Sequence, residues 1–534
     1  LLLPFLFAFF FWNPEDFLGG KTEHTNTMGA GLDKELAKKK NRKKEKIDLK
    51  GRGLTGLPAT IGGLHCKELI LCENDLTVLP PEIGKLDTVE ILDANKNRLN
   101  SLPEEIGDLK TLTQLYLAHN KLFFMPLTPK LGQLCNLQLL VLSDNKLDEL
   151  PRELSQCSAL TSLDLSENAL KTLPPEFGRL ENMKTLNLSN NQLRQLPSEL
   201  GNMRSLSELL LTHNLLMQVP PEIANMRSLK TLRLGFNKLS EVPPTISHLS
   251  TLEDLELRDN PGLVEIPSLE GLSMLNHLSL RNLQLTTVPG LGSLASLTDL
   301  DLRDNFKLGC VPDDIANLVN LKKLDLYGCG IKTVPSFIGN LRQLESLDLR
   351  KNALDNEGIP NEVSGLTGLI RLLLSNNAFT QVPPQILALP ALREFEISGN
   401  KIMELTPEIG RLVTLQRFNI GNNKLQKLPD TIGSLTELTN LTIKCNELKE
   451  LPAEIAKLVY LERLDMSENL VAALPYQMGH MKNLKTLDVT SNPLIIPPGP
   501  EVNKGTDAML FWLRDNEDTL IKGAKISGLG LEKK

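Results

Sequence analysis

The sequence predicts an α/β solenoid: a horseshoe of stacked repeats with a continuous parallel β-sheet on the concave face and short helical or 3-10 turns on the convex face. Two observations carry this prediction. A phrase of the form L-x-L-x-x-N-x-L-x-x-L-P recurs through most of the 534 residues, and its spacing is mostly 23 residues. A repeat of that length cannot enclose a core of its own, so it must stack on its neighbours to bury its leucines.

The asparagine of this phrase forms a column, and we expect its amide to bond backbone groups where the chain turns out of each strand. Seventeen repeats carry it: Asn74, Asn97, Asn120, Asn145, Asn168, Asn191, Asn214, Asn237, Asn260, Asn305, Asn352, Asn377, Asn400, Asn423, Asn446, Asn469 and Asn492. Arg52, Leu283 and Cys329 fill the same position in three more, which makes twenty. Cysteine is a tolerated substitute, whereas leucine cannot make these hydrogen bonds.

The alternation of side chains along a strand assigns each position to a face. In Leu186-Asn187-Leu188 the leucines are predicted to point into the core and Asn187 onto the concave face. Ile47-Asp48-Leu49 reads as the first, degenerate strand. Repeats between about 260 and 360 are the least regular, so we expect a local change of curvature there.

The domain organisation follows from the repeat boundaries. The solenoid is predicted over 47–498, followed by a capping helix over 499–520 and a tail over 521–534. Met509, Leu510, Trp512 and Leu513, with Val502 before them, would cover the last leucine layer, because both ends of such a stack need caps. Before the solenoid lie an apolar leader over 1–27 and a basic tail over 28–46.

The leader has two interpretations. Its apolar run, Leu1 to Trp12, is too short to span a bilayer. We expect translation to begin at Met28, which would make the leader an extension, and the alternative is the remnant of a secretory signal. Seven scattered cysteines, odd in number and without terminal clusters, favour a reducing, cytoplasmic location.

The charge distribution bears on partners. The chain carries a formal −7, and Asp33–Lys46 carries a local +5, which leaves −12 on the rest and argues against nucleic-acid binding. If Met28 starts the chain, Gly29 approaches a myristoylation site. Its acyl chain together with the basic tail would allow peripheral membrane contact, although Asp33 stands where Ser or Thr is expected.

The sequence offers no recognisable catalytic or cofactor site. The seven histidines have no metal-ligand spacing with cysteine or acidic residues, and no phosphate-binding loop or nucleophile elbow is present. We therefore predict no enzyme, no metal and no cofactor.

Two columns on the predicted concave face carry an ordered charge pattern. One column reads Arg258, Arg281, Arg303, Tyr327 and Arg350, and the column two residues earlier reads Glu256, Ser279, Asp301, Asp325 and Asp348. Residues i and i+2 share a face, so basic and acidic stripes lie side by side. Two interpretations stay open: a surface lattice of self-satisfied ion pairs, or a partner-docking strip anchored by Tyr327 and the arginines.

The repeat phrase at 438–458, LTNLTIKCNELKELP followed by AEIAKL, resembles the intracellular Ras-group leucine-rich-repeat proteins. The closing segment 492–516 looks like the terminal cap of leucine-rich-repeat-containing protein 40 and its relatives. This resemblance covers residues 47–516 and implies a scaffold or adaptor, in some members bridging a small GTPase of the Ras type and a phosphatase catalytic subunit. The basic tail lacks the valine-x-phenylalanine motif for phosphatase docking, which argues against that role.

The resulting expectation is a non-enzymatic protein-binding scaffold in intracellular signal transduction. The alternatives are a secreted or cell-surface recognition module and a regulatory subunit of a phosphatase.

Overall fold

The structure is a computed structural model that describes residues 45–123 and 127–527. The predicted leader, the candidate acylation site Gly29 and nearly all of the basic tail lie outside the described residues. The chain forms two compact units, residues 1–163 and 164–534, each of which is described on its own.

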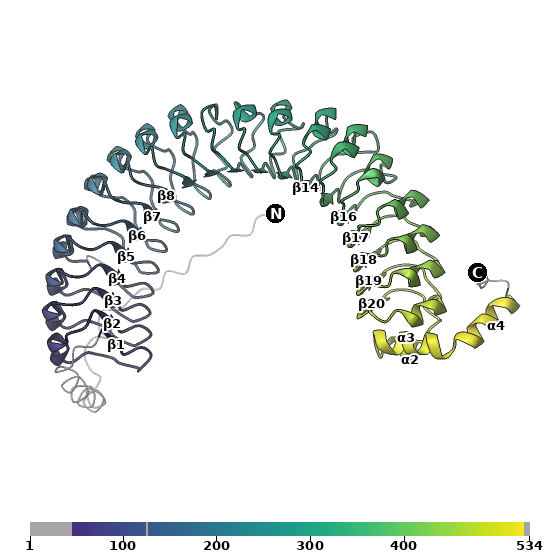
Figure 1. Ribbon diagram of the computed structural model, residues 1–534, viewed down its shortest axis with the longest axis horizontal. Helices are drawn as coiled ribbons and strands as arrows, with labels where there is room; N and C mark the ends of the chain where they lie inside the picture. The colour runs from purple at the N-terminus through teal and green to yellow at the C-terminus, as the bar shows by residue number, and fades with distance from the viewer. Residues whose placement is uncertain (1–44, 124–126, 528–534) are drawn as a thin grey trace, which may run out of the picture. The chain divides into compact units, whose positions relative to one another are not determined.

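Each repeat contributes one three-residue strand, and the described residues hold twenty of them (Figure 1). The first six are β1 (Lys46–Asp48), β2 (Glu68–Ile70), β3 (Ile91–Asp93), β4 (Gln114–Tyr116), β5 (Leu139–Val141) and β6 (Ser162–Asp164). The others are β7 (Thr185–Asn187), β8 (Glu208–Leu210), β9 (Thr231–Arg233), β10 (Asp254–Glu256), β11 (His277–Ser279), β12 (Asp299–Asp301), β13 (Lys323–Asp325), β14 (Ser346–Asp348), β15 (Arg371–Leu373), β16 (Glu394–Glu396), β17 (Arg417–Asn419), β18 (Asn440–Thr442), β19 (Arg463–Asp465) and β20 (Thr486–Asp488).

Neighbouring strands pair parallel and in register, from β1 to β5 in the first unit and from β7 to β20 in the second. The central residue of each strand points into the core: Leu186, for example, is 0 % exposed, as is Leu188 just after the strand. Asn187 lies on the opposite, open face, as predicted. The first strand begins at Lys46, one residue earlier than expected, and it buries Ile47 and Leu49.

The return segments are 3-10 helices on the side opposite the sheet. Pro220 and Pro221 show why these turns form, because two prolines fix the backbone at the entry and Ile223, one turn later, is buried. In the first unit they are η1 (Ala59–Gly63), η2 (Pro81–Lys85), η3 (Glu104–Asp108), η4 (Pro129–Gln133) and η5 (Arg152–Gln156). In the second they are η6 (Pro175–Arg179), η7 (Ser198–Asn202), η8 (Pro221–Asn225), η9 (Pro244–His248), η10 (Leu291–Ser293), η11 (Asp313–Asn317), η12 (Ser336–Asn340), η13 (Asn361–Gly365), η14 (Pro384–Ala388), η15 (Pro407–Arg411), η16 (Asp430–Ser434), η17 (Ala453–Lys457) and η18 (Tyr476–His480).

The predicted solenoid architecture is thus confirmed. The irregular stretch is also visible: none of the described residues between β10 and β11 forms a 3-10 helix, and η10 has only three residues.

The asparagine column ties each repeat to the one before it. Asn260 is 0 % exposed, and its Nδ2 donates to the carbonyls of Leu257, in its own repeat, and Leu234, in the preceding one, at 2.7 and 3.0 Å. Its Oδ1 accepts from the Leu239 N–H at 3.0 Å. Cys329 partly reproduces this role, because its Sγ donates to the Leu302 carbonyl at 3.1 Å. Leu283 is buried, but a leucine side chain has no group to offer.

The C-terminal cap differs from the single helix predicted over 499–520. It consists of α2 (Gly499–Val502), α3 (Thr506–Asp515) and α4 (Glu517–Ser527), so helical structure continues into the expected tail. Gly505, with φ of 98°, is the residue just before α3, and Asn516 turns the chain between α3 and α4.

Residues of α3 cover the last layer. Met509, Leu510 and Leu513 are buried as expected, while Trp512 is half-buried. Thr506 Oγ1 accepts from the Leu487 N–H at 2.9 Å, at the open edge of the last strand. In the described part of the chain, the helices are all too short or too polar to cross a membrane.

Candidate functional site

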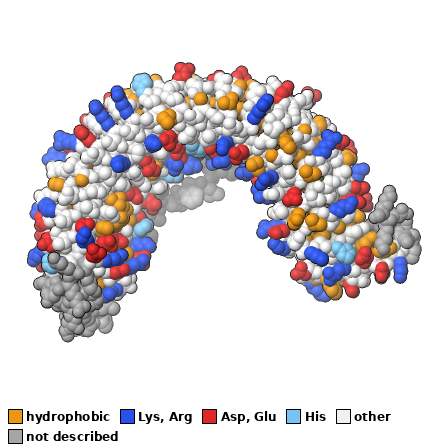
Figure 2. Space-filling model, in the orientation of Figure 1, with side chains coloured by type: hydrophobic (Ala, Val, Ile, Leu, Met, Phe, Trp, Pro, Cys, Tyr) orange, Lys and Arg blue, Asp and Glu red, His pale blue; other side chains and the backbone are white. Residues whose placement is uncertain are grey.

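The nine predicted site residues lie together on the open face of the sheet in the second unit. Strand register places Glu256, Ser279, Asp301, Asp325 and Asp348 in one line across β10 to β14. The residues two positions later, Arg258, Arg281, Arg303, Tyr327 and Arg350, form the neighbouring line. We call these ten positions the charged strip. Figure 2 shows acidic and basic side chains interspersed over the surface rather than gathered in blocks of one sign.

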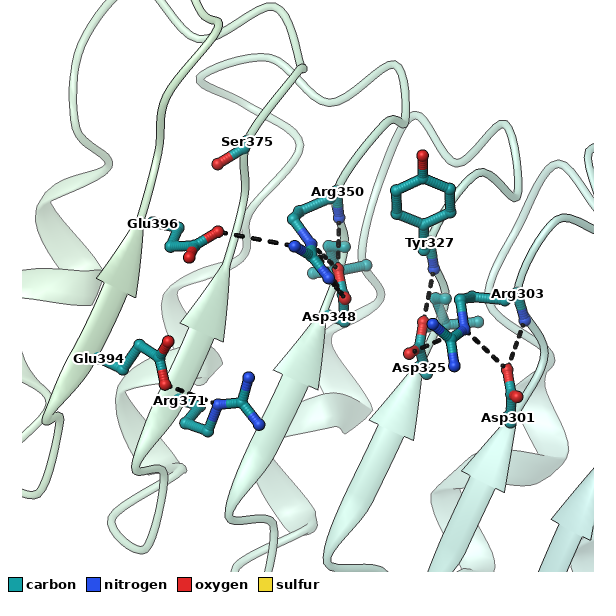
Figure 3. A network of polar contacts seen from close by, with 12 residues as sticks. Asp301, Arg303, Asp325, Tyr327, Asp348, Arg350, Arg371, Ser375, Glu394 and Glu396 are labelled. Carbon is teal, nitrogen blue, oxygen red and sulfur yellow. Dashed lines mark hydrogen bonds and ion pairs between the residues drawn. The ribbon is translucent and has the colours of Figure 1, made fainter. Parts of the chain in front are cut away.

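Most arginines of the charged strip pair with a carboxylate on their own strand. Arg258 Nε lies 2.7 Å from Glu256 Oε1, and Arg350 Nη2 lies 2.5 Å from Asp348 Oδ2. Arg303 Nε lies 3.4 Å from Asp301 and 3.3 Å from Asp325, the carboxylate of the next strand (Figure 3). These contacts are the ones that the alternation of charges predicted.

The carboxylates are more buried than a surface lattice would require. Glu256 is 8 % and Asp348 5 % exposed, and Ser279 between them in the column is 4 % exposed. Hydrogen-bonded ion pairs in such positions cannot be treated as freely solvated, because removal of one partner leaves a buried charge. The pairs of Asp348 and Glu256 therefore differ from the exposed ion pairs of a surface lattice.

Burial also perturbs protonation. Desolvation, followed by the nearby charge of Asp348, raises the pKa of Asp325 to about 6. Burial likewise raises the pKa of Glu396, which lies 3.7 Å from Arg350 Nη1. Asp325 in the charged strip and Glu396 beyond it are therefore carboxylates whose negative charge is only partly balanced by the neighbouring arginines.

A third line of charges, formed by the first residue of each strand, was missed by sequence reasoning. Lys323 Nζ lies 2.7 Å from Asp299 Oδ1. Glu394 Oε2 lies 2.8 Å from Arg371 Nε and 2.7 Å from Arg417 Nη2. The first residue of each strand lies two positions before the acidic column and shares its face. Applying the alternation to this position, and continuing beyond Ser375, would have identified these residues.

An aromatic stack at the edge of the charged strip was also missed. The rings of His213 and Phe236 are parallel, with centroids 4.2 Å apart, and the Arg258 guanidinium carbon lies 5.0 Å from the Phe236 centroid. Phe236 remains 36 % exposed. Exposed aromatic rings beside arginine are common at protein interfaces.

Between the three lines lies a shallow hollow of about 350 Å³, lined among others by Asp325, Asp348, Arg371 and Leu373. Ser346, whose side chain is short, lies where Lys323 and Arg371 stand on the adjacent strands, which leaves the space open. The hollow presents fixed charges of both signs, and its geometry suits the recognition of a polar or charged segment.

Three of the seven thiols are deeply buried and keep their protons. Burial raises the pKa of Cys66 to about 11 and those of Cys157 and Cys329 to about 12. All seven cysteines are free. Within the described ranges, no three His, Cys, Asp or Glu side chains converge as a metal site would require.

Comparison with known proteins finds leucine-rich-repeat families over most of the solenoid. A family model described as leucine rich repeat matches residues 65–122, 135–193, 158–216 and 204–261, and one described as leucine-rich repeat region matches 300–399 and 384–492. Leucine-rich repeat protein lrrA of Dictyostelium discoideum is 50 % identical over 101 residues, which is 19 % of this chain. That match spans only 20 % of the curated relative's length.

Two solved structures share the architecture over most of the chain. A leucine-rich-repeat protein of Leptospira interrogans is 32 % identical, with 78 % of this chain and 94 % of that one covered and a TM-score of 0.56. The plant peptide hormone receptor RGFR1, solved in complex with RGF2, is 29 % identical, with coverage of 84 % and 75 % and a TM-score of 0.60.

Proposed function

Because this chain belongs to the leucine-rich-repeat family, we propose that it is a protein-binding scaffold that holds its partner on the open face of the sheet in the second unit. The observation that carries the proposal is the charged strip with its adjoining stack and hollow. Paired charges lie in register beside exposed aromatic rings, and such surfaces suit specific protein recognition.

The proposed mode of action is binding rather than catalysis. A scaffold of this kind would act as an intracellular adaptor in signal transduction, and seven free cysteines support a reducing, cytoplasmic compartment. A small GTPase or a phosphatase catalytic subunit is the partner class that the Ras-group resemblance implies. The basic tail would add reversible membrane contact if Gly29 is acylated.

A second candidate is a secreted or cell-surface recognition module. It is favoured by the likeness to RGFR1, a peptide hormone receptor solved with its ligand. Both candidates require the open face to bind a partner, and they differ in compartment. Fractionation of cells expressing the protein, with sequencing of the mature N-terminus, separates them.

Binding by the charged strip can be tested by affinity capture with mass spectrometry. The bait is compared with a variant carrying Arg258→Glu, Arg303→Glu and Arg350→Glu. We expect specific partners to be lost from this variant. The matched control carries Arg227→Glu, Arg342→Glu and Arg411→Glu, at exposed positions in or beside the 3-10 turns on the other side, and should retain every partner.

Because reversal of Arg350 endangers the buried Asp348, a second variant, Tyr327→Ala, tests the same surface without creating an unpaired charge. Circular dichroism of each variant verifies that it is folded. Partners that bind both strip variants as well as they bind the original chain would contradict the proposal.

A further inference from the structure

Two of the four arginines of the charged strip connect carboxylates on different strands. Arg303 bridges Asp301 on its own strand, β12, and Asp325 on the next strand, β13. Arg350 bridges Asp348 on β14 and Glu396 on β16, because Leu373 replaces the acid on β15. At β12 and β14, the residue two positions after the strand thus supplies a cation between that strand's acid and the next acid of the column.

Between these two arginines, at β13, the bridging is interrupted. Tyr327 occupies the position from which a cation would bridge Asp325 and Asp348. Among the described residues, no basic side chain forms an ion pair with both of these carboxylates. Figure 3 shows the ring of Tyr327 directed away from them, while Arg303 and Arg350 turn toward their acids on either side.

The interruption leaves negative charge uncompensated. Asp301, Asp325, Asp348 and Glu396 share the two guanidinium groups of Arg303 and Arg350. The raised pKa of Asp325, with Asp348 as its second-largest cause, is the consequence expected of a half-buried and a buried carboxylate without a cation between them.

The space for such a cation is present. Asp325 and Asp348 both line the 350 Å³ hollow described above. The nearby Lys323 and Arg371 pair with Asp299 and Glu394, so neither neutralises the two acids.

Resting on the proposed function, we propose that a lysine or arginine side chain of a partner protein enters the hollow and bridges Asp325 and Asp348, supplying the cation that is missing between Arg303 and Arg350. The partner is therefore recognised through a basic residue in a segment that lies along the sheet face. Arginine fits best, because its planar fork can bond two carboxylates at once, as Arg303 does.

The test uses a library of 12-residue peptides displayed on phage and selected on the full chain. Peptides that bind the original chain but not the Arg258→Glu, Arg303→Glu, Arg350→Glu variant are synthesised as strip binders. Each is then remade with arginine replaced by citrulline or lysine by norleucine, which removes the charge and keeps the length. Affinities are measured for the original chain, for Asp325→Asn and for the control Asp430→Asn, an exposed aspartate in η16.

We expect neutralisation of one basic residue in the peptide to weaken binding at least tenfold. Asp325→Asn should weaken binding by a similar factor, the two changes together should cost no more than either alone, and Asp430→Asn should have no effect. Lowering the pH from 7.5 to 5 should weaken binding about tenfold, because about nine-tenths of Asp325 is protonated one unit below a pKa of about 6. Asparagine keeps the acceptor for the Tyr327 N–H, so this variant should fold.

Strip binders that tolerate both citrulline or norleucine and Asp325→Asn would overturn the inference and leave the proposed function standing. A selection that yields binders only outside the charged strip, or none, would contradict both.

Discussion

Asp325 is a carboxylate that the folded chain keeps ionised at a cost, and its replacement by asparagine should stabilise the second unit at neutral pH. The pKa rises from 3.8 to about 6, a difference of about two units. At 1.36 kcal/mol per unit this corresponds to about 3 kcal/mol of unfolding free energy. The side chain is only 25 % exposed, so solvent screening leaves most of this effect intact.

The pH dependence has a definite sign. Because the folded-state pKa lies above the unfolded value, the folded chain binds an extra proton between about pH 4 and pH 6. The contribution of Asp325 to stability is therefore most favourable below pH 4 and is lost as the pH rises through 6. An asparagine at this position cannot titrate, so the advantage of the Asp325→Asn variant should be near zero at pH 4 and reach its full value above pH 7.

The assay compares the original chain and Asp325→Asn by urea unfolding at pH 4 and pH 7.5, with hydrogen exchange of β13 and β14 as the local readout. Long repeat arrays can lose two-state behaviour, so the local measurement is decisive. At pH 7.5, exchange in the variant should be slower by about 100-fold, which is about 3 kcal/mol at 1.36 kcal/mol per tenfold. Equal exchange at pH 7.5, or a gain of the same size at pH 4, would refute the reasoning.

Three further predictions follow from burial and hydrogen bonding. Asn260→Ala leaves two carbonyls and one N–H of buried backbone without their partner. Urea unfolding should therefore show a loss of at least about 3 kcal/mol in unfolding free energy, and a loss below about 1 kcal/mol would contradict the role of the column. Leu513→Ala, at a fully buried cap residue, should cost about 2–5 kcal/mol and speed exchange in β20, whereas the exposed Phe511→Ala should change little; equal effects would argue against the cap packing. In the native chain Cys135 and Cys310, which are exposed, should react first with a thiol reagent. Fast labelling of the buried thiols before unfolding would contradict their environment; these are Cys66, Cys157 and Cys329.

The fold could be predicted from the sequence because its period leaves few alternatives. A 23-residue repeat with inward leucines must stack, and the asparagine column marks where each strand ends. Cap burial at Met509 and Leu513 was predictable for the same reason, since an open leucine layer must be covered. The division of the cap into three helices was not predicted, although Gly505, just before α3, is a sequence signal for the first break.

The sequence predicted where the candidate site lies, but it did not predict the burial of its carboxylates or the aromatic stack beside it. Alternation along a strand assigns Asp348 to the open face, but it does not show that neighbouring side chains cover it to 5 % exposure. The stack of His213 on Phe236 depends on side-chain orientations at equivalent places of adjacent repeats, which a periodic pattern does not encode. The extension to Glu394 was missed because the arginine column ends at Ser375, although the acid–base alternation continues one line away.

The asparagine column gives the stack a direction. Each amide serves the repeat that precedes it, as Asn260 serves Leu234 and Leu239, so loss of a following repeat deprives its predecessor of partners, whereas loss of a preceding repeat frees only the amide itself. Most joints between repeats are chemically alike, so duplication or deletion of one whole repeat would recreate the same joint. The joint at Leu283 departs furthest from this pattern, because a leucine cannot serve the repeat before it, whereas Cys329 does so in part. Changes in repeat number should therefore be tolerated on either side of this joint more readily than across it.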